Sequence, residues 1–421
     1  MTSKHHQIVI IGAGTAGITV AARLRNTHSQ FDVALIDPAE VHYYQPAFTL
    51  VAADTFDFKK TARPMASLIP AGVTWIKQAV TSIDPDQNQV TTSADDQITY
   101  DYLVVCPGIQ IDLHGTPGLA EAFRKNQVCS IYVDPVKTLG HLQNFKGGTA
   151  LFTTPHTPIK CGGAPQKIMY LAEDFWRKEG VTDKKIVFAT PGTIIFGTPE
   201  FAKTLMQVVD RKKIHLRFFH KLNRVDGDKK LAYYTITAHA NEPDKLYHNS
   251  IDLNESFTSA TEVVIPWDFM HVPPPQSAPD FIKKSKLAYA DGPNQGWLNV
   301  NINTLQHNVY PNVFGLGDSA ALPTAKTGAA IRKQAPIVVE NILKVMKKEA
   351  ELKQYYGYSS CPLVTGYGKM VLAEFKYDNI RDSDPMISKF VDTTKENYSM
   401  WLLKKYGLPF MYWNLMLKGR A

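Results

Sequence analysis

Three glycines near the start of the chain place the strongest constraint on its fold. Gly12, Gly14 and Gly17 have the spacing G-x-G-x-x-G, between a β-branched run at residues 7–11 and a helical pattern at residues 18–25. In such a turn the first glycine permits the sharp bend, the second lets a pyrophosphate approach the backbone, and the third lets helix and strand pack closely. The helix N-terminus then points free N–H groups at the phosphates. The pattern predicts a Rossmann-type βαβ unit that binds a dinucleotide.

An acidic residue completes this unit. A second strand is predicted at residues 31–36, and Asp37 follows it directly, 20 residues after Gly17. A carboxylate at this place accepts hydrogen bonds from ribose hydroxyls. Strand, glycines, helix, strand and acid in register are much more specific than the glycines alone. The alternative interpretation is a glycine-rich turn without a ligand.

A later segment indicates which dinucleotide is bound. Residues 309–318 are predicted to form a turn and a buried strand that ends at Asp318, and Lys326 precedes a long helix at residues 329–348. An aspartate at a strand end can bind the ribityl hydroxyls of a flavin, and a lysine beside a helix N-terminus can stabilise negative charge on the reduced ring. We therefore expect a flavin. In the alternative, Asp318 caps a helix and Lys326 is a surface charge.

A second βαβ-like segment lacks the glycine pattern. Strands are predicted at residues 149–154, 185–189 and 214–219, with helices at residues 165–178 and 200–212. The first of these strands runs into Pro155-His-Thr-Pro-Ile-Lys-Cys-Gly-Gly-Ala-Pro165. Its prolines, and the lack of G-x-G-x-x-G there, argue against a second pyrophosphate site. Hydride transfer from a nicotinamide is therefore not expected.

Cys161 lies within this proline- and glycine-rich loop. Lys160 precedes it, Lys167 follows it, and the next helix is predicted to begin near residue 165. Positive charge and a helix N-terminus both lower the pKa of a thiol and favour the nucleophilic thiolate. We interpret Cys161 as redox-active, because an inert buried cysteine would suit an apolar strand better. Cys361, in Y-S-S-C-P-L-V-T-G-Y, has a similar predicted setting.

Composition narrows the class of protein. A chain of 421 residues can form two or three domains, and four cysteines are too few for a disulfide framework. The net charge of +7 is mild, and solvated lysines explain it more simply than an anionic partner does. We expect no nucleic-acid partner, and no metal, since His156 and His220 lack metal-ligand spacing. The N-terminus passes directly into a strand, so we expect no signal peptide and a cytosolic face.

The end of the chain is apolar and aromatic. Seven of the eight residues at 410–417 are apolar, a run that is too short to span a bilayer. It suits an interfacial helix whose apolar side enters the bilayer and whose flanking lysines contact lipid headgroups. The alternative is a C-terminal helix that packs on the core or on another subunit.

Taken together, these motifs resemble those of the sulfide:quinone oxidoreductases, and most closely the type II branch of this flavoprotein family. The resemblance runs nearly end to end and includes G-A-G-T-A-G, Y-Q-P-A-F-T-L-V, W-I-K-Q-A-V, K-C-G-G-A-P-Q-K-I-M-Y-L, G-L-G-D, T-A-K-T-G and S-C-P-L-V-T-G-Y. It implies an α/β fold of two Rossmann-like dinucleotide-binding domains and a C-terminal amphipathic membrane-attachment region. The expected domains are residues 1–115 with 288–350, residues 116–287, and residues 351–421.

The resemblance also implies an activity. Cys161 and Cys361 would form a redox-active disulfide, with Lys167 as a further candidate catalytic residue. Hydrogen sulfide would leave a persulfide on Cys361, and two electrons would pass through FAD to a membrane quinone, either ubiquinone or menaquinone. The persulfide sulfur would go to an acceptor such as sulfide, glutathione or sulfite. The implied FAD contacts are Thr15, Ala16, Asp37, Gln45, Val80, Asp318 and Lys326, in addition to the three glycines.

Some assignments stay open. Cys129 falls near a third cysteine of the type I enzymes, so it either handles sulfur or is a buried strand thiol, whereas Cys106 is interpreted as a packing residue. The expected location is peripheral, on the cytoplasmic face of a bacterial plasma membrane, and a homo-oligomer is allowed. Two alternative functions are a type II NADH:quinone oxidoreductase and a non-catalytic flavoprotein redox sensor.

Overall fold

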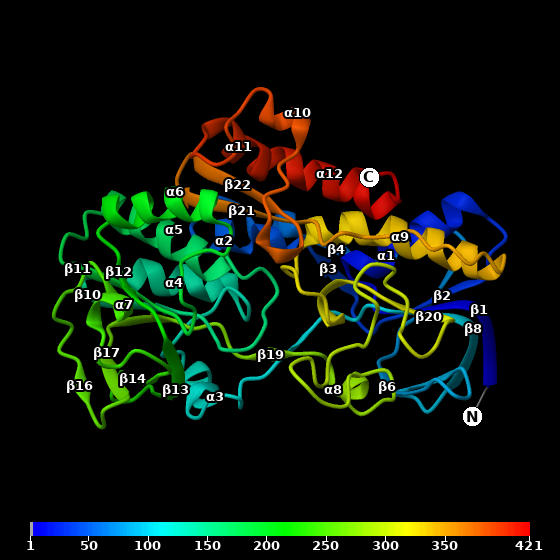
Figure 1. The fold of residues 1–421 in the computed structure, drawn as a ribbon, viewed down its shortest axis with the longest axis horizontal. Helices are drawn as coiled ribbons and strands as arrows, with labels where there is room; N and C mark the ends of the chain where they lie inside the picture. Colours follow the sequence, from blue (N-terminus) through cyan, green and yellow to red (C-terminus); the bar gives the residue numbers. More distant parts are fainter. Residues whose placement is uncertain (1–2) are drawn as a thin grey trace.

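The computed structural model describes residues 3–421 as two α/β lobes with a C-terminal layer across both (Figure 1). The first lobe is built on a seven-stranded sheet in the order β5-β2-β1-β8-β7-β6, with β20 also paired to β8. Its strands are β1 (Ser3–Ile11), β2 (Val33–Ile36), β5 (Val73–Ile76), β6 (Val80–Asp84), β7 (Gln89–Thr92), β8 (Gln97–Val105) and β20 (Val313–Gly315). Strands β5, β2, β1, β8 and β20 are parallel, whereas β6 and β7 join the sheet antiparallel.

The central strand of this sheet is covered on both faces. Residues 8–11 of β1 are all buried, as expected for a parallel sheet enclosed by other elements. Helix α1 (Thr15–Thr27) begins directly after the glycine turn and packs against α9 (Gly328–Met346). The predicted elements around Asp37 and Asp318 are therefore confirmed, and both acids follow strands of one sheet.

The second lobe has a five-stranded sheet in the order β15-β12-β11-β10-β18. Its strands are β10 (Gly148–Thr153), β11 (Lys184–Ala189), β12 (His215–Arg217), β15 (Tyr247–His248) and β18 (Phe269–His271). Side chains alternate between two cores: Ala150 and Phe152 pack with α5 (Ala164–Lys178), whereas Leu151 packs with a second, antiparallel sheet. That sheet consists of β13 (His220–Asp226), β14 (Leu231–Ile236), β16 (Ser256–Phe257) and β17 (Glu262–Pro266). The other main helices of the lobe are α4 (Pro135–Asn144) and α6 (Pro199–Arg211).

The two lobes are joined by a pair of short antiparallel strands. The chain leaves the first lobe through β9 (Gln110–Ile111) and returns through β19 (Gln276–Ser277), which pair with each other. Immediately after β19, Ala278 and Ile282 belong to the core of the first lobe.

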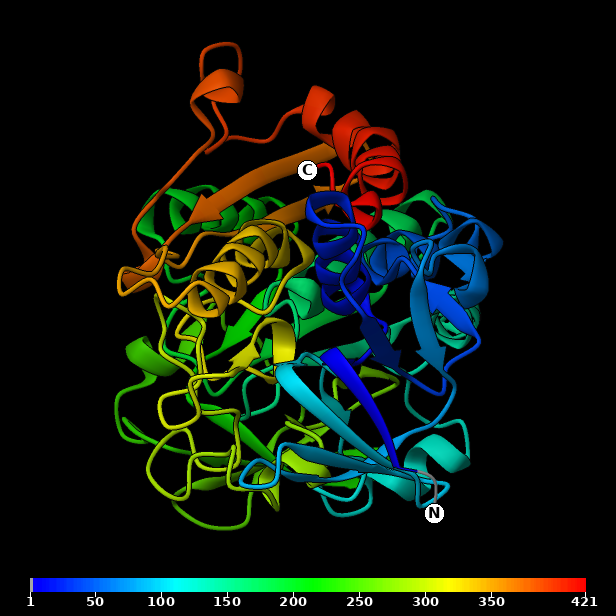
Figure 2. The ribbon, with the colours of Figure 1, turned by 90° about the vertical axis from the view of Figure 1, so that its right-hand side faces the viewer.

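The C-terminal layer holds a hairpin and a broken helix. The hairpin of β21 (Ser359–Gly366) and β22 (Lys369–Phe375) packs on α5, and the helix runs from α11 (Tyr398–Leu402) through a π-helical turn (Leu403–Gly407) into α12 (Leu408–Asn414). The end of this helix lies beside α1, as Figure 2 shows. Tyr412, Trp413, Met416 and Leu417 are buried in the core of the first lobe. Half of the apolar run at residues 410–417 thus packs on protein, as the alternative interpretation of the tail expected.

Residues 3–421 contain no helix with both the length and the apolar character needed to cross a membrane. The apolar stretches of the tail are instead short and interrupted, and they lie across the top of the fold in Figure 1.

The glycine turn gives a test of the packing at the start of α1. A Cβ on Gly17 would lie 1.8 Å from the Gly12 carbonyl oxygen, a backbone atom held by the sheet. We expect Gly17→Ala to lower the free energy of unfolding by about 1–3 kcal/mol, the usual effect of overpacking a core. The measurement is urea denaturation of the flavin-free protein. Gly14→Ala is the matched control, because a Cβ there meets no atom within 4 Å; equal losses in both variants would contradict this account.

Candidate active site

The glycine turn has the form that a dinucleotide requires. Gly12 has φ +101°, and a Cβ on it would lie 2.6 Å from the Cys106 carbonyl oxygen. The Asp37 carboxylate accepts hydrogen bonds from Ala13 N at 2.7 Å and Ala39 N at 2.8 Å, so it is fixed at the end of β2 beside the turn. Open space lies around the Cα of Gly14, where a pyrophosphate would approach. These residues fit a bound dinucleotide.

A second group of polar residues lies where α9 begins. Asp318, in the turn after β20, is close to Lys160 and Lys326. Burial raises the pKa of Asp318, and the two lysines oppose this rise. Lys326 donates to the Ala320 carbonyl at 2.9 Å and lies 4.2 Å from the centre of the Trp297 ring, and burial lowers its pKa to about 8. This set of groups fits the hydroxyls and the electron-rich edge of a flavin.

Lys160 lies between the polar group around Asp318 and Gln45, another predicted FAD contact. Its ammonium donates to the Gln45 side-chain oxygen at 2.7 Å, and its strand-like backbone is paired with that of Lys326. Val80 is buried at the start of β6, and Ala16 is buried in α1. The hydroxyl of Thr15 is hydrogen-bonded to Tyr412 at 2.7 Å, so it is already engaged by the C-terminal helix.

Two cysteines from distant parts of the chain meet at the start of α5. Cys161 is in the loop before this helix with φ +83°, a left-handed conformation that is uncommon for residues other than glycine. Cys361 comes from β21, and its thiol interacts with that of Cys161; both are free thiols in this structure. Gly163 allows the strand to approach, since a Cβ on it would lie 2.8 Å from the Cys361 sulfur. Cys361 is in a buried strand, which corrects the expectation of a loop like that of Cys161.

The electrostatics of the pair differ between the two thiols. Lys167, one turn into α5 and 3% exposed, donates to the Cys161 sulfur at 3.1 Å. The interaction with Cys361 and the Lys167 ammonium hold the pKa of Cys161 well below its usual value, against the opposing effect of burial. The hydrogen bond with Cys161 and burial raise the pKa of Cys361. The site therefore combines Cys161, whose pKa is lowered, Cys361, whose pKa is raised, and the Lys167 ammonium.

A second lysine beside the cysteine pair was missed by sequence reasoning. Lys404, in the π-helical turn of the C-terminal layer, is 2% exposed and donates to the Pro46 carbonyl at 2.8 Å. Burial and the charge of Lys167 lower its pKa to about 7, while the two cysteines act in the opposite direction. The prediction that the tail lysines contact lipid headgroups is thus wrong for Lys404. The only feature of the sequence that could have indicated a buried Lys404 was its position within an apolar run.

The other two cysteines lie in the cores. Cys129 is 2% exposed and its thiol donates to the Met270 carbonyl at 3.5 Å. Cys106 is 4% exposed at the end of β8. Burial raises the pKa of both thiols. These surroundings favour packing roles for the two residues.

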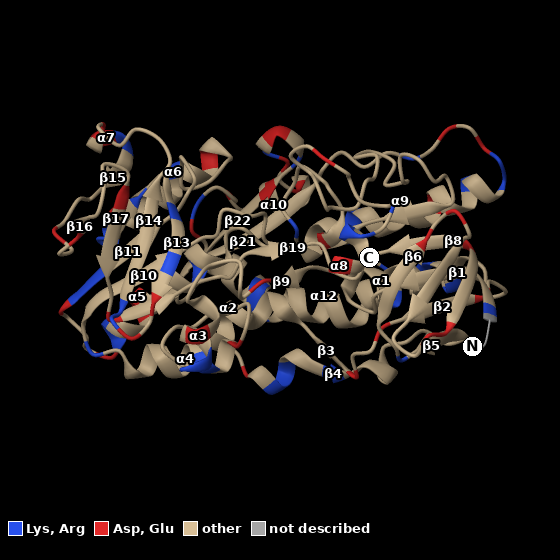
Figure 3. Ribbon diagram, turned by 90° about the horizontal axis from the view of Figure 1, so that it is seen from below, with Lys and Arg blue, Asp and Glu red and all other residues tan. Residues whose placement is uncertain are grey.

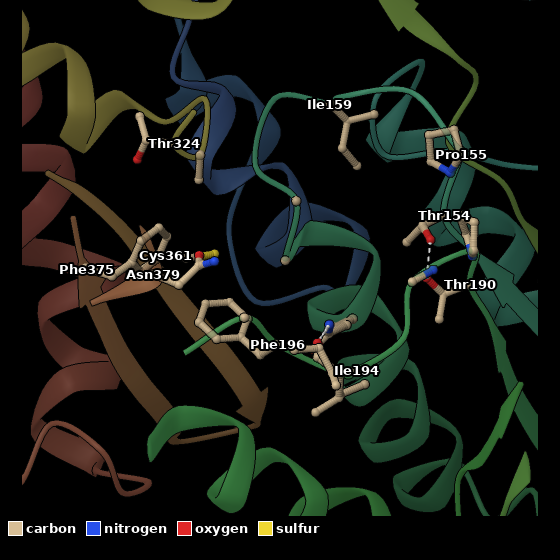
Figure 4. Close-up of a pocket in the computed structure, with 18 of the residues that line it drawn as sticks. Thr154, Pro155, Ile159, Thr190, Ile194, Phe196, Thr324, Cys361, Phe375 and Asn379 are labelled. Carbon is tan, nitrogen blue, oxygen red and sulfur yellow. Dashed lines mark hydrogen bonds between the residues drawn. The ribbon is translucent and has the colours of Figure 1, made fainter. Parts of the chain in front are cut away.

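A cavity of about 610 Å³ is lined by Cys361 together with Gly162 and Gly163, which follow Cys161. It is at the carboxyl ends of β10 and β11, and Figure 4 shows Cys361 across the cavity from Thr154 and Thr190. The hydroxyls of these two threonines are 2.8 Å apart. Open α/β sheets bind ligands in the crevice at this edge.

Comparison with known proteins decides the family. Residues 6–137 match the model of the pyridine nucleotide-disulphide oxidoreductases. The mitochondrial sulfide:quinone oxidoreductase of Mus musculus is 40% identical over 99% of this chain and 87% of its own length. The chain belongs to the sulfide:quinone oxidoreductases. It is therefore a flavoprotein oxidoreductase.

Other members of the sulfide:quinone oxidoreductases agree with this assignment. The mitochondrial enzyme of Dictyostelium discoideum is 38% identical over 98% of this chain and 86% of its own length. The crystal structure of the enzyme from Aquifex aeolicus superposes with a TM-score of 0.75 at 21% identity, covering 98% of this chain and 92% of that one. This likeness confirms the predicted fold class.

The contact between Lys167 and Cys161 predicts a pH effect. In the reduced wild-type protein the lowered pKa of Cys161 favours its thiolate. In Lys167→Met the pKa rises, so the thiolate forms only at higher pH, and the midpoint of the pH profile for alkylation of Cys161 by iodoacetamide should move upward by about one pH unit, since a hydrogen bond to a charged group contributes about 1.5 kcal/mol or more. Mass spectrometry of the modified peptide across pH gives the midpoint. Lys178→Met, an exposed change at the end of α5, is the control; an unmoved midpoint in Lys167→Met would contradict the assignment.

Proposed function

We propose that this protein oxidises hydrogen sulfide at the Cys161–Cys361 pair and passes two electrons through FAD to a membrane quinone. The observation that carries the proposal is the 3.1 Å contact between the Lys167 ammonium and the Cys161 sulfur, beside the buried thiol of Cys361. A flavoprotein has no need of a stabilised thiolate unless sulfur takes part in its chemistry. The similar proteins of Mus musculus and Dictyostelium discoideum are named for sulfide and a quinone, which supports the proposal.

The different surroundings of the two cysteines support distinct roles. In the oxidised enzyme, hydrosulfide attacks the Cys361 sulfur of a Cys161–Cys361 disulfide, the bond between the cysteines breaks, and Cys161 leaves as a thiolate. The thiol of lower pKa is the better leaving group, and Lys167 lowers the pKa of Cys161. The new bond makes a persulfide on Cys361. Lys404 adds a second positive charge beside the same sulfur atoms when it is protonated.

FAD is the form of flavin that the residues favour. The glycine turn with Asp37 fits a pyrophosphate and an adenosine ribose, and Asp318 with Lys326 fits the flavin end of the same molecule. When bound, FAD accepts two electrons from the cysteine pair and delivers them to the quinone. Lys326, whose pKa burial lowers to about 8, is placed to oppose negative charge at that end.

The outer side of the C-terminal layer supports peripheral membrane attachment. Leu402 is 39%, Tyr406 62% and Phe410 63% exposed, on the same broken helix whose other side carries Lys404 and Tyr412 into the protein. Elsewhere, basic and acidic residues are interspersed over both lobes, as Figure 3 shows. We propose that these apolar side chains enter a bilayer and admit the quinone. The cytoplasmic face of a bacterial plasma membrane and a homo-oligomer stay predictions.

The cysteine pair provides the main test. Anaerobic sulfide should bleach the flavin of the wild-type protein, and decylubiquinone should restore it. Cys161→Ser and Cys361→Ser should each slow bleaching at least about 1,000-fold, because the nucleophilic exchange has no substitute. Cys129→Ser is the matched control and should bleach normally if Cys129 only packs. If NADH bleaches the flavin and sulfide does not, the type II NADH:quinone alternative is correct; bleaching that a quinone cannot reverse would favour the sensor.

The exposed apolar residues give a second test. Tyr406→Asp and Phe410→Asp should each weaken cosedimentation with phospholipid vesicles by about tenfold, because burial of one large apolar side chain contributes about 1.5–3 kcal/mol. Val309→Asp changes a residue that is 66% exposed on the first lobe and should bind vesicles as the wild type does. Unchanged sedimentation of all three variants would show that the tail does not attach the protein to lipid.

A further inference from the structure

The two cysteines belong to elements that run side by side in the same direction. Cys161 precedes α5, and Cys361 is in β21, which packs along this helix (Figure 1). The helix from Ala164 to Asp174 spans about 15 Å, and an extended strand from Cys361 to Tyr367 spans about 20 Å. The far end of β21 therefore reaches the second half of α5, well away from the sulfur atoms.

Asp174 fixes the far end of this strand to the helix. It is 6% exposed, and one of its carboxylate oxygens accepts a hydrogen bond at 2.7 Å from the backbone N–H of Tyr367, in the turn between β21 and β22. The approach is so close that a Cβ on Gly366 would lie 2.3 Å from the same oxygen. The Tyr367 hydroxyl donates at 2.8 Å to the carbonyl of Ala53, directly after α2 (Phe48–Ala52). The turn of the hairpin is thus held at two points, and one of them is a charge-assisted hydrogen bond.

Two cations hold the Asp174 carboxylate in place. Its other oxygen accepts hydrogen bonds from the Lys212 ammonium at 2.6 Å and from the Arg177 guanidinium at 2.7 Å. Lys212 follows α6, its side chain is almost fully buried, and it also donates to Glu173 at 2.7 Å. Burial acts to raise the pKa of Asp174, but its hydrogen-bond partners outweigh burial and lower the pKa, so the group is a carboxylate. Both of its oxygens are therefore fixed, one by the cations and one by the hairpin.

We propose that Asp174 is a positioning residue for the cysteine pair: by holding the turn of the hairpin on α5, it keeps Cys361 within bonding reach of Cys161 at the other end of the strand. This inference rests on the proposed function, in which a bond between the two sulfurs forms and breaks. Such a bond requires the two Cα atoms to lie within about 7 Å of each other, so a strand that slipped along the helix would separate the sulfurs. Asp174 contacts neither sulfur and acts through β21.

The test measures how readily the two cysteines close into a disulfide. Anaerobic holoenzyme is equilibrated with mixtures of reduced and oxidised glutathione, and the thiols are then alkylated and the cysteine peptides quantified by mass spectrometry. One glutathione disulfide becomes two glutathione thiols as the two cysteines form one disulfide, and the flavin spectrum counts any electrons that pass to FAD. The equilibrium constant is the effective concentration of one cysteine at the other.

Asp174→Asn should lower this effective concentration at least about tenfold, the effect of losing a hydrogen bond to a charged group. The reason is that an amide has only one oxygen. Its NH₂ group must face either the cations or the Tyr367 N–H, both of which are donors, so the hairpin and the cations can no longer be held together.

Glu173→Gln is the matched control. Glu173 is 7% exposed and shares Lys212 with Asp174, so the substitution removes the same charge from the same buried network. Its partners, Lys212 and Arg177, both lie outside the hairpin, and the variant should keep the wild-type effective concentration. A loss of stability alone would instead affect both variants.

Gly366→Ala tests the same contact without a change of charge. Its methyl group would push the turn away from Asp174, so the effective concentration should fall as it does in Asp174→Asn. Gly140→Ala, in α4, is the control for this variant, because a Cβ there meets no atom within 4 Å. If Asp174→Asn does not fold, Gly366→Ala decides.

The outcomes separate the inference from the proposed function. Sulfide bleaching of the wild-type flavin reports on the proposed function, and its absence would show that function to be wrong. If the wild type bleaches but Asp174→Asn and Gly366→Ala keep its effective concentration, or if its cysteines form no disulfide, the inference is overturned. Equal losses in Asp174→Asn and Glu173→Gln would also overturn it, because the charge of the network, and not its contact with the hairpin, would then be responsible.

Discussion

The contact of the Lys167 ammonium with the Cys161 sulfur is the interaction on which the site depends. Lys167 is almost fully buried, and a buried ammonium is stable only beside a compensating negative charge. The thiolate supplies that charge, and in return its pKa is lowered. The pair forms where the loop before α5 takes the left-handed backbone seen at Cys161 and where β21 brings Cys361 against Gly163. Helix, loop and hairpin are positioned around one ion pair.

The C-terminal layer connects this ion pair with the dinucleotide turn. Lys404 donates to the Pro46 carbonyl close to the cysteines, and further along the same helix Tyr412 is hydrogen-bonded to Thr15 and His42. Both contacts are on the inner side of a helix whose outer side is apolar and exposed. A change in how this helix packs would therefore act on the cysteine pair and on the dinucleotide turn together.

Sequence reasoning was strongest where backbone geometry dictates the residue type. Gly12 and Gly17 must be glycines because a Cβ would collide with backbone, so their spacing identified the turn, its strands and Asp37. It was weakest where long-range packing decides the surroundings. The S-S-C-P-L-V-T-G run has no alternation of polar and apolar residues, so nothing local placed Cys361 in a buried strand. The burial comes from long-range contacts, because β21 pairs with β22 along one edge and packs against α5 and α9. Lys404 was missed for the same reason, since a lysine in an apolar tail is ordinarily exposed.

The second lobe retains the framework of a dinucleotide-binding domain while its crevice has other chemistry. The parallel strands β10 and β11 still end at one edge, where the fold places a ligand, yet the first loop carries prolines and Cys161 instead of a phosphate turn. Cys361 consequently has two neighbours of different character: Cys161 with the Lys167 ammonium, and a cavity whose lining, among the described residues 3–421, has no charged side chain.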